Sequence, residues 1–501
     1  MDEAGFKGRI EMDQTRMPLL EALKRHAELK RVSMHVPGHK NGQVFHKDAE
    51  VFFKDILTLD VTEIEGMDDL HQPEGIILEA EILAALLFRA AETLFLVGGS
   101  TAGNLAMILG TLNEGDRVLV QRSSHQSVLH GLEMAGASPV FLEPERDSKT
   151  GITYGVSEAT VREAVSAWPE AKALLLTSVS YEGYGQDLTG HVHFAHEAGM
   201  CVLVDEAHGP HLIFNQDRWP ASALRAGADA VVQSAHKMLP AMTMSSWLHV
   251  QGNRVNRNRI KKYLRMLQSS SPSYPLMASL DAARAYLAAY TETQGEQMAE
   301  WSRQFRDRLN RIPQICTASE KINGFVQDPL KVVIESRCRA SGRELQKAFA
   351  EEGIIAELAG HRHVLFTLPF TVSEPEYEAA AAAVQRACSP YAVSPDPHTV
   401  HGRKFNSEKR RITPLALSYR EMDRQVPQKV PFIEAAGLIA AEDVVPYPPG
   451  IPFILKGETI SYEQVEELKE LVSKGVSFQS GRGFITEGLS VYPGRGENKD
   501  I

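Results

Sequence analysis

The chain has 501 residues, several times the roughly 150 typical of one domain, so two or three domains are expected. Hydrophobic residues make up 43% and charged residues 23%, which excludes a chain that is disordered throughout. The net charge of -11 argues against a general nucleic-acid-binding protein, because such proteins usually carry a basic surface.

The cysteines and the apolar runs set the expected compartment. Cys201, Cys316, Cys338 and Cys388 have no C-x-x-C spacing, so neither a zinc site nor a disulfide framework is predicted. Free thiols fit a reducing cytoplasm. The acidic, polar start of the sequence has no apolar signal-peptide core, and no apolar run is long enough to span a membrane.

The first half of the chain is predicted to alternate helices with short apolar strands. A helix over 18–30 is followed by a loop over 32–42 and an apolar helix over 76–91. Strands are predicted at 93–97, 117–121, 139–142, 173–178, 200–205 and 228–233, with helices at 104–112, 127–135 and 191–198. This alternation predicts a parallel sheet covered on both faces, with ligands at the carboxyl ends of the strands.

The second half is predicted to hold two further domains. Helical sequence over 279–309 leads into strands at 331–335 and 364–368, which indicate a smaller α/β domain. A segment rich in proline and charge reads as a linker, and the tail contains Y-P-P-G-I-P, which cannot be helix interior. The expected division is an N-terminal segment 1–75, a large domain 76–290, a small domain 291–393, a linker 394–411 and a C-terminal domain 412–501.

Polar clusters follow four of the predicted strands, and they are the candidate site. Lys237, in S-A-H-K, would be partly desolvated at a strand end, which lowers the pKa of a lysine and makes it a nucleophile. Asp205 begins D-E-A-H-G after another strand. Taken alone, Lys237 could be a surface lysine in a loop, and Asp205 could simply cap a helix. Together with the glycine-rich turn 98–104 they form a more specific set.

That turn, G-G-S-T-A-G-N, opens a predicted helix. Glycines let the backbone approach a phosphate, hydroxyls donate to it, and the helix N-terminus favours an anion. The sequence is neither the Walker pattern nor G-x-G-x-x-G, so a nucleotide site is the poorer interpretation.

In chain order the glycine-rich turn comes first, followed by S-H-Q-S, Asp205 and Lys237, and in this order the clusters resemble pyridoxal-phosphate enzymes of fold type I. H-V-P-G-H-K, D-D-L-H, S-H-Q-S, S-P-S-Y, A-S-L-D, E-A-A-G and Y-P-P-G-I-P resemble the ornithine/lysine/arginine decarboxylase family over almost the whole chain. The length is similar to that of the short bacterial form. The resemblance implies an α/β fold: a large domain with a mostly parallel seven-stranded sheet, a smaller α/β domain and a C-terminal domain.

The resemblance also implies residue roles around a pyridoxal 5'-phosphate cofactor. Lys237 would be the Schiff-base lysine, and Asp205 would pair with the pyridine nitrogen. His125 would stack on the ring, Ala207 would pack on its opposite face, and His208 would lie near the phenolic oxygen. The phosphate would be held by Ser100, Thr101, Ala102, Ser234 and His236, joined by Ser271 or Ser273 from the partner in a homodimer or higher even-numbered homo-oligomer.

The activity implied is α-decarboxylation of arginine, lysine or ornithine to agmatine or a diamine, in polyamine metabolism and in the cytoplasm, with no nucleic-acid or membrane partner and no metal. Gln126 stands where the family often has lysine, and S-V-S-Y-E-G at 178–183 replaces N-P-T-Y-x-G, so the substrate pocket departs from the pattern. The alternatives are a fold type I aminotransferase, with Arg362 binding the α-carboxylate, an aldolase, or a non-catalytic binding protein that has kept the fold.

Overall fold

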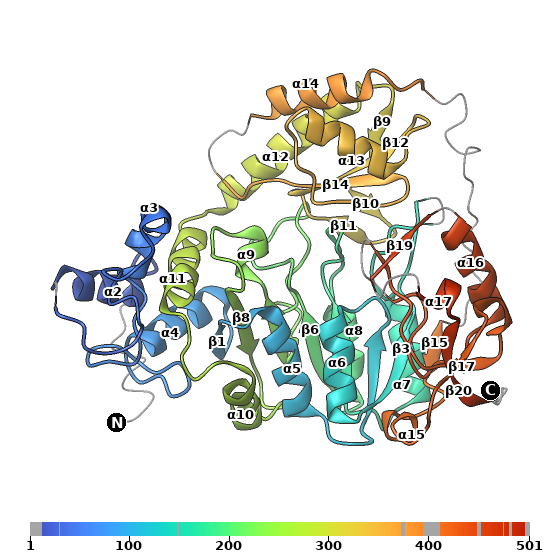
Figure 1. Cartoon of the computed structure of the whole chain (residues 1–501), viewed down its shortest axis with the longest axis horizontal. Coiled ribbons are helices and arrows are strands. Elements are labelled where there is room, and N and C mark those ends of the chain that lie inside the picture. The colour runs from blue at the N-terminus through green and yellow to red at the C-terminus, as the bar shows by residue number, and fades with distance from the viewer. Residues whose placement is uncertain are drawn as a thin grey trace.

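The computed structural model describes residues 13–29, 31–147, 150–371, 376–393, 411–447, 452–473, 475–479 and 483–495. A large sheet with its helices forms the centre, an N-terminal arm lies at one end, and a C-terminal unit lies at the other (Figure 1). The small α/β unit sits over one edge of the centre. The predicted linker lies outside the described residues except for Arg411, as does most of the Y-P-P-G-I-P segment.

The large sheet has the strand order β1-β8-β7-β6-β4-β2-β3-β15. Its strands are β1 (Glu92–Leu96), β2 (Arg117–Gln121), β3 (Ser138–Leu142), β4 (Ala173–Thr177), β6 (Cys201–Asp205), β7 (Ala230–Gln233), β8 (Ser246–Val250) and β15 (Ile412–Pro414). Strands β8 and β15 run antiparallel to their neighbours, and the other pairings are parallel. The seven strands before β15 confirm the predicted sheet, and β15 is an addition from the C-terminal segment.

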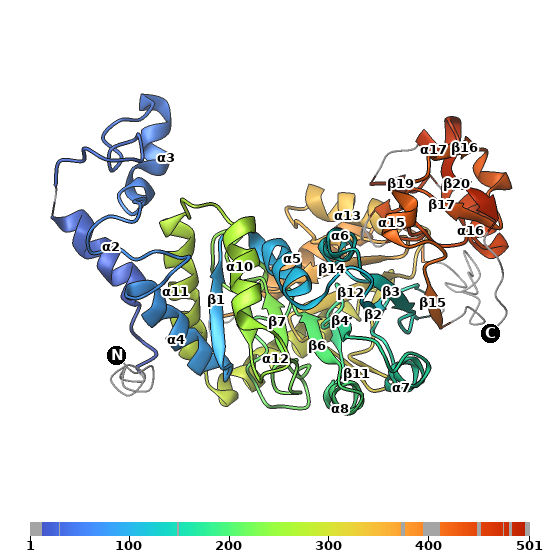
Figure 2. The same ribbon diagram turned by 90° about the horizontal axis from the view of Figure 1, so that it is seen from below.

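Helices cover both faces of this sheet, and its central strands are therefore buried along nearly their whole length. One face packs against α5 (Gly99–Thr111), α6 (Gln126–Ala135) and α10 (Arg257–Leu267). The other packs against α4 (Ile76–Phe88), α7 (Glu158–Ala167), α8 (Thr189–Glu197) and α11 (Tyr274–Ala288) (Figure 2). The predicted helices are present, but the one expected at 104–112 begins at Gly99, so the glycine-rich turn is its first turn.

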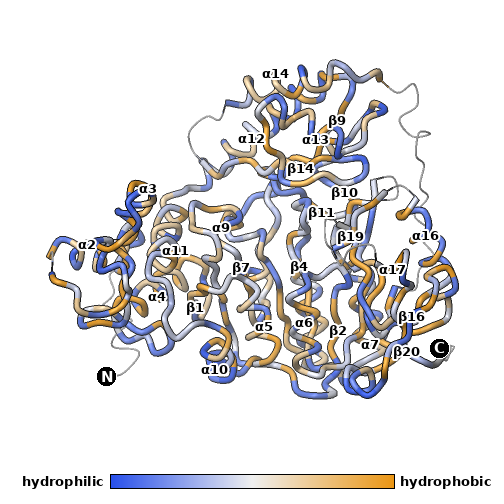
Figure 3. Tube along the Cα trace, in the orientation of Figure 1, coloured by the Kyte–Doolittle hydropathy of each residue, from blue (hydrophilic) through white to orange (hydrophobic). Residues whose placement is uncertain are grey.

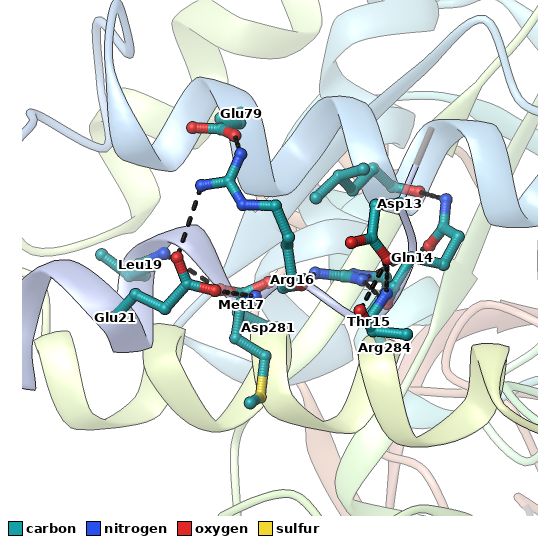
Figure 4. Close-up of polar contacts among 11 residues, drawn as sticks. Asp13, Gln14, Thr15, Arg16, Met17, Leu19, Glu21, Glu79, Asp281 and Arg284 are labelled. Atoms are coloured by element: carbon teal, nitrogen blue, oxygen red, sulfur yellow. Dashed lines mark hydrogen bonds and ion pairs between the residues drawn. The ribbon is translucent and has the colours of Figure 1, made fainter. Parts of the chain in front are cut away.

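The N-terminal arm is tied to the centre by buried polar contacts from α11. Arg284 donates to the carbonyls of Gln14 and Arg16 at 2.6 and 2.5 Å and pairs with Asp281 at 2.6 Å (Figure 4). Asp281 also accepts from the amide of Leu19, in the first turn of α2 (Pro18–Glu28). The A-S-L-D motif therefore supplies a structural anchor. Helix α3 (Lys47–Leu57) completes the arm.

The D-D-L-H motif also has a structural role. Both carboxylate oxygens of Asp68 accept backbone amides at the start of α4, including Gly75 at 2.8 Å and Ile77 at 3.0 Å. The first amides of a helix have no partner within the helix, so a buried carboxylate here stabilises its N-terminus.

The small unit is a four-stranded sheet of order β13-β14-β12-β9 packed against helices. Its elements are α12 (Glu292–Leu309), β9 (Ile315–Thr317), β12 (Lys331–Ser336), α13 (Gly342–Glu351), β13 (Leu358–Ala359), β14 (His363–Thr367) and α14 (Tyr377–Cys388). A separate three-stranded sheet joins it to the centre through β5 (Tyr184–Gly185), β10 (Lys321–Ile322) and β11 (Phe325–Gln327).

The C-terminal unit has its own apolar core. It contains α15 (Tyr419–Met422), β16 (Gln428–Val430), η1 (Phe432–Glu434), β17 (Leu438–Ala440), β18 (Pro446–Tyr447), α16 (Tyr462–Ser473), β19 (Ser477–Phe478), α17 (Gly483–Thr486) and β20 (Leu489–Arg495). Hydrophobic residues are concentrated inside each unit, while α3 carries several at the edge of the molecule (Figure 3). Among the described residues, no helix is long and apolar enough to cross a bilayer.

Candidate active site

The polar clusters lie at one edge of the large sheet, because β1, β2, β6 and β7 run in the same direction. Helix α5 begins directly after β1 at Gly99, whose φ of 73° favours glycine. Ser100, Thr101 and Ala102 form its first turn, where free backbone amides and the helix dipole favour an anion.

A hydrogen-bonded chain connects Asp205 to His125. The amide nitrogen of Asn104 donates to Asp205 Oδ2 at 2.8 Å and to Ser127 Oγ at 2.9 Å. The Ser127 backbone amide donates to His125 Nδ1 at 3.2 Å, so this nitrogen is an acceptor and the Ser127 hydroxyl, 2.8 Å away, also donates to it. Asp205 Oδ1 accepts the backbone amide of Ala207 at 3.1 Å. These contacts fix both the buried carboxylate and the ring plane of the histidine.

Lys237 lies in α9 (Ala235–Met238), one turn beyond the end of β7. Its Nζ is 3.1 Å from Nε2 of His208, which follows Asp205 in the neighbouring β6 loop. Burial lowers the pKa of Lys237, although Asp205 and Glu357 oppose the shift. The pKa of His208 is also held well below its usual value, by burial and by Lys237 and Lys331. A lysine with a lowered pKa is closer to its nucleophilic, neutral form.

Lys331 is a member of this cluster that the sequence did not reveal. It begins β12 in the small unit, is 1% exposed, and its Nζ lies 3.5 Å from His208 Nδ1 and 3.0 Å from Thr367 Oγ1. Asn104 and Ser127, in contrast, lie within predicted motifs, but the sequence predicted no role for them. The common signal is a buried polar side chain whose partner is far along the chain.

The remaining predicted residues divide into two groups. Ser234 is fully buried, and its hydroxyl has no hydrogen-bond partner among the described residues, while His236 Nδ1 lies 3.1 Å from the Ser245 carbonyl. Ser271 is exposed, and Ser273 caps α11 by accepting from Leu276 at 3.5 Å. The structure thus brings Ser234 and His236 next to Lys237, and gives Ser271 and Ser273 no hydrogen bond to the cluster within the described residues.

Arg362 does not point toward this cluster. Its guanidinium donates to the carbonyls of Ser336 at 2.8 Å and Cys338 at 3.4 Å. Ser336 ends β12, five residues from Lys331, which is about 16 Å along an extended strand. An α-carboxylate clamp by Arg362, the feature expected of an aminotransferase, is not supported by this placement.

Family models identify both the centre and the tail of the chain. The Orn/Lys/Arg decarboxylase major domain matches residues 17–329, and the C-terminal domain of the same family matches residues 400–487. The chain belongs to the Orn/Lys/Arg decarboxylase family. It is a pyridoxal-phosphate-dependent decarboxylase, as the sequence motifs predicted.

Similar proteins cover the chain almost end to end. An uncharacterised protein of Bacillus subtilis, YaaO, is 43% identical over 95% of this chain and 98% of its own length. An arginine decarboxylase of the same organism is 35% identical over 93% of this chain and 96% of its own. The solved lysine decarboxylase of Francisella novicida has a TM-score of 0.78 at 19% identity, covering 96% of this chain and 81% of that one, and supports the fold alone.

The site fits the cofactor that this family requires. An unpartnered buried hydroxyl at Ser234 and a glycine-rich helix start suit a phosphate group, and a buried carboxylate beside a lysine of lowered pKa suits a pyridine ring bound through its aldehyde. In the described residues, no cluster of side chains is suited to a metal ion, and all four cysteines are free.

Proposed function

We propose that the protein decarboxylates arginine to agmatine and carbon dioxide, as a step of polyamine synthesis in the cytoplasm. The observation that carries the reaction type is the buried Lys237–His208 pair beside the anchored Asp205. Arginine is favoured over lysine because arginine decarboxylases are 33–35% identical to this chain, whereas the lysine decarboxylases are 22–24% identical. Four free cysteines support a reducing compartment.

Each site residue has a proposed task that its surroundings support. The cofactor supplies a conjugated ring that accepts the electron pair left when the carboxylate departs. Lys237 is the point of covalent attachment, since its lowered pKa makes the amine available. Asp205, fixed by Asn104 and Ala207, would pair with the ring nitrogen of the bound cofactor and keep it protonated. An ionised partner is required there, because a neutral one would not keep that proton in place.

The other residues bind and orient. His125, whose ring plane is fixed by Ser127, and Ala207 would hold the cofactor ring between them. The phosphate is bound by the α5 N-terminus with Ser100, Thr101 and Ala102, and by the residues flanking the lysine, Ser234 and His236. His208, whose Nε2 is 3.1 Å from the Lys237 amine, would exchange a proton with that amine and would help to hold the phenolic oxygen of the bound cofactor.

The test is product analysis with arginine, lysine and ornithine in parallel. The wild-type protein should release agmatine fastest, and Lys237→Ala should abolish both turnover and the covalent cofactor link that borohydride traps. Lys262→Ala, which removes an exposed lysine on α10, is the matched control and should retain full activity. Release of a diamine instead of agmatine would refute the substrate, and a fully active Lys237→Ala would refute the site.

We further propose that the active form is a homodimer. Helix α3 buries only Leu57, while Val51 and Phe52 are 79% and 81% exposed, and Met34 in the preceding loop is 89% exposed. These residues belong to the arm that protrudes from the centre of the molecule (Figure 2). Exposed apolar side chains on such an arm are typical of a surface that another subunit covers. The exposed Ser271 loop is then free to reach the partner's phosphate, with Ser273 beside it.

Complementation tests this assembly. Lys237→Ala and a loop variant with bulky residues at Ser271 and Ser273 should each be inactive. After subunit exchange the mixture should recover up to about a quarter of wild-type activity, because a random heterodimer holds one intact site. An active monomer on sizing, or no recovery after verified exchange, would contradict a shared site.

A further inference from the structure

His208 lies between two lysine side chains that come from different units of the fold. Its Nε2 is 3.1 Å from Nζ of Lys237, and its Nδ1 is 3.5 Å from Nζ of Lys331. The imidazole ring is buried, with the Tyr181 ring centroid 4.8 Å from its own. Each ring nitrogen of His208 therefore contacts the amine of a different lysine, Lys237 at Nε2 and Lys331 at Nδ1.

This arrangement limits the protonation states of the three groups. Burial and the two lysines hold the pKa of His208 well below its usual value, so the ring is neutral. A neutral imidazole has one N–H donor and one lone-pair acceptor, whereas an ammonium group can only donate. The ring can accept from only one of the lysines, and the other must offer a lone pair, which requires a neutral amine.

The surroundings of Lys331 favour it as the charged partner. Its Nζ also donates to Thr367 Oγ1 at 3.0 Å, so the group already acts as a donor. Its side chain passes Gly183, where a Cβ would lie 2.6 Å from the lysine Cβ, so a glycine is needed for this approach. Burial and the neighbouring Lys237 lower the pKa of Lys331, while three carboxylates, Asp328, Glu357 and Glu182, oppose that shift, against Asp205 and Glu357 at Lys237.

We propose that Lys331 is a positioning residue that fixes the tautomer of His208 and thereby holds Lys237 as a neutral amine. The Lys331 ammonium donates to Nδ1, the ring keeps its proton on Nε2, and Nε2–H donates to the Lys237 lone pair. The small unit thus prepares the nucleophile of the large unit. This inference rests on the proposed role of Lys237 as the cofactor-binding lysine.

Other charged and titratable groups also face this cluster, and they are unchanged between the wild type and the Lys331 variants described below. Lys237 faces Asp205, Glu357, His125 and His236. His208 also faces His125 and His211, and the latter is paired with Asp328 at 3.0 Å. The effect of Lys331 must therefore be measured by changing it alone and by breaking the bridge through His208.

The experiment titrates Lys237 directly in the full-length protein freed of cofactor. Trace labelling with acetic anhydride over about pH 6 to 10, read by peptide mass spectrometry, gives the pKa of that amine. Lys331→Met should raise the pKa of Lys237 by about one unit, so that labelling at neutral pH falls about tenfold. Lys331→Arg should restore most of the labelling, because it keeps a charged donor. Lys321→Met, which removes an exposed lysine of β10, should change nothing.

The bridge is tested in a His208→Phe background, where Lys331→Met should shift the pKa of Lys237 by less than half as much. An equal shift there would mean that Lys331 acts as a bare charge, and no shift in the wild-type background would mean that it does not act on Lys237; either result overturns the proposal. Lys331→Gln replaces Lys331→Met if the latter does not fold by circular dichroism. Because neither cofactor nor substrate is present, these outcomes are independent of whether arginine is decarboxylated.

Discussion

Breaking the buried ion pair between Arg122 and Glu458 should destabilise the C-terminal unit where it packs against the large domain. Arg122 lies just after β2, and its two terminal nitrogens contact the Glu458 carboxylate at 2.6 and 2.8 Å. The two residues are 8% and 3% exposed. Gln464 donates to the same carboxylate at 2.7 Å, and Arg122 also reaches the Phe453 carbonyl at 3.2 Å.

The magnitude follows from burial. Replacing Glu458 by leucine leaves a buried guanidinium without its main partner, which costs about 3–5 kcal/mol. Glu143 remains 3.6 Å from Arg122 Nε, so the lower end, about 3 kcal/mol, is expected. Replacing both residues by leucine removes the unpaired charge, and the double variant should be close to the wild type. The expected order of stability is therefore wild type first, the double variant slightly below it, and the single variant lowest.

Hydrogen–deuterium exchange can measure this locally, since a chain with several units does not unfold in one step. About 3 kcal/mol corresponds to roughly 100-fold faster exchange in peptides of β17 and α16 in Glu458→Leu. Glu487→Leu is the matched control, because its pair with Lys429 is exposed and contributes about 0.5 kcal/mol or less. If the single variant exchanged no faster than the control, or the double variant were as labile as the single, the reasoning would be wrong.

Three further changes test the site and its support. Asp205→Asn should slow decarboxylation by roughly 100-fold or more and loosen the cofactor on dialysis, since a neutral amide cannot stabilise a protonated ring nitrogen; a rate within about threefold of wild type would exclude the pairing. Burial raises the pKa of Glu81 from 4.5 to about 8, so the folded state binds a proton that the unfolded state releases. The stability that Glu81 contributes is thus fully present below pH 4.5 and lost as pH rises through 8; Glu81→Gln should remove up to about 5 kcal/mol of this pH dependence, measured by urea unfolding at several pH values. Gly183→Ala should lower the thermal midpoint more than Gly199→Ala, because both have positive φ but only the former would bring a Cβ within 2.6 Å of Lys331; equal losses would show that strain alone decides.

The strands that the sequence predicted are those whose apolar runs are unbroken. Strand β8 was missed because its sequence, S-W-L-H-V, places a histidine in a buried strand. His249 is accommodated only because Thr93 lies 2.8 Å from Nδ1 and Gln233 lies 3.0 Å from Nε2, and neither partner is visible from local sequence. Strand β15 has three residues and pairs with β3, some 270 positions earlier, so no local pattern could predict it.

In the site, residues that form short motifs were predictable, and residues that act through distant contacts were not. Lys237 and Asp205 each follow a buried strand within a recognisable sequence. Asn104 reaches Asp205 across 101 positions, and Lys331 reaches His208 across 123. Asparagine in a helix and lysine at a strand start normally indicate solvent exposure. Asn104 is buried by contacts within the large unit, whereas Lys331 is buried where the small unit meets the large one, and neither partner is visible from local sequence. The boundaries predicted for the domains stay a prediction.

The C-terminal unit contacts the loop that carries His125 from both sides of that residue. Arg122, three positions before it, is held by Glu458, and Gln126, directly after it, donates to Gln479 at 2.9 Å. His125 is in turn linked through Ser127 and Asn104 to Asp205. A segment that supplies no predicted catalytic group is therefore connected to the residues proposed to bind the cofactor ring by a continuous path of hydrogen bonds and one loop. The contact of Gln126 with Gln479 joins two neutral amides, so it should be insensitive to salt, whereas the buried Arg122 pair sets the position of the loop.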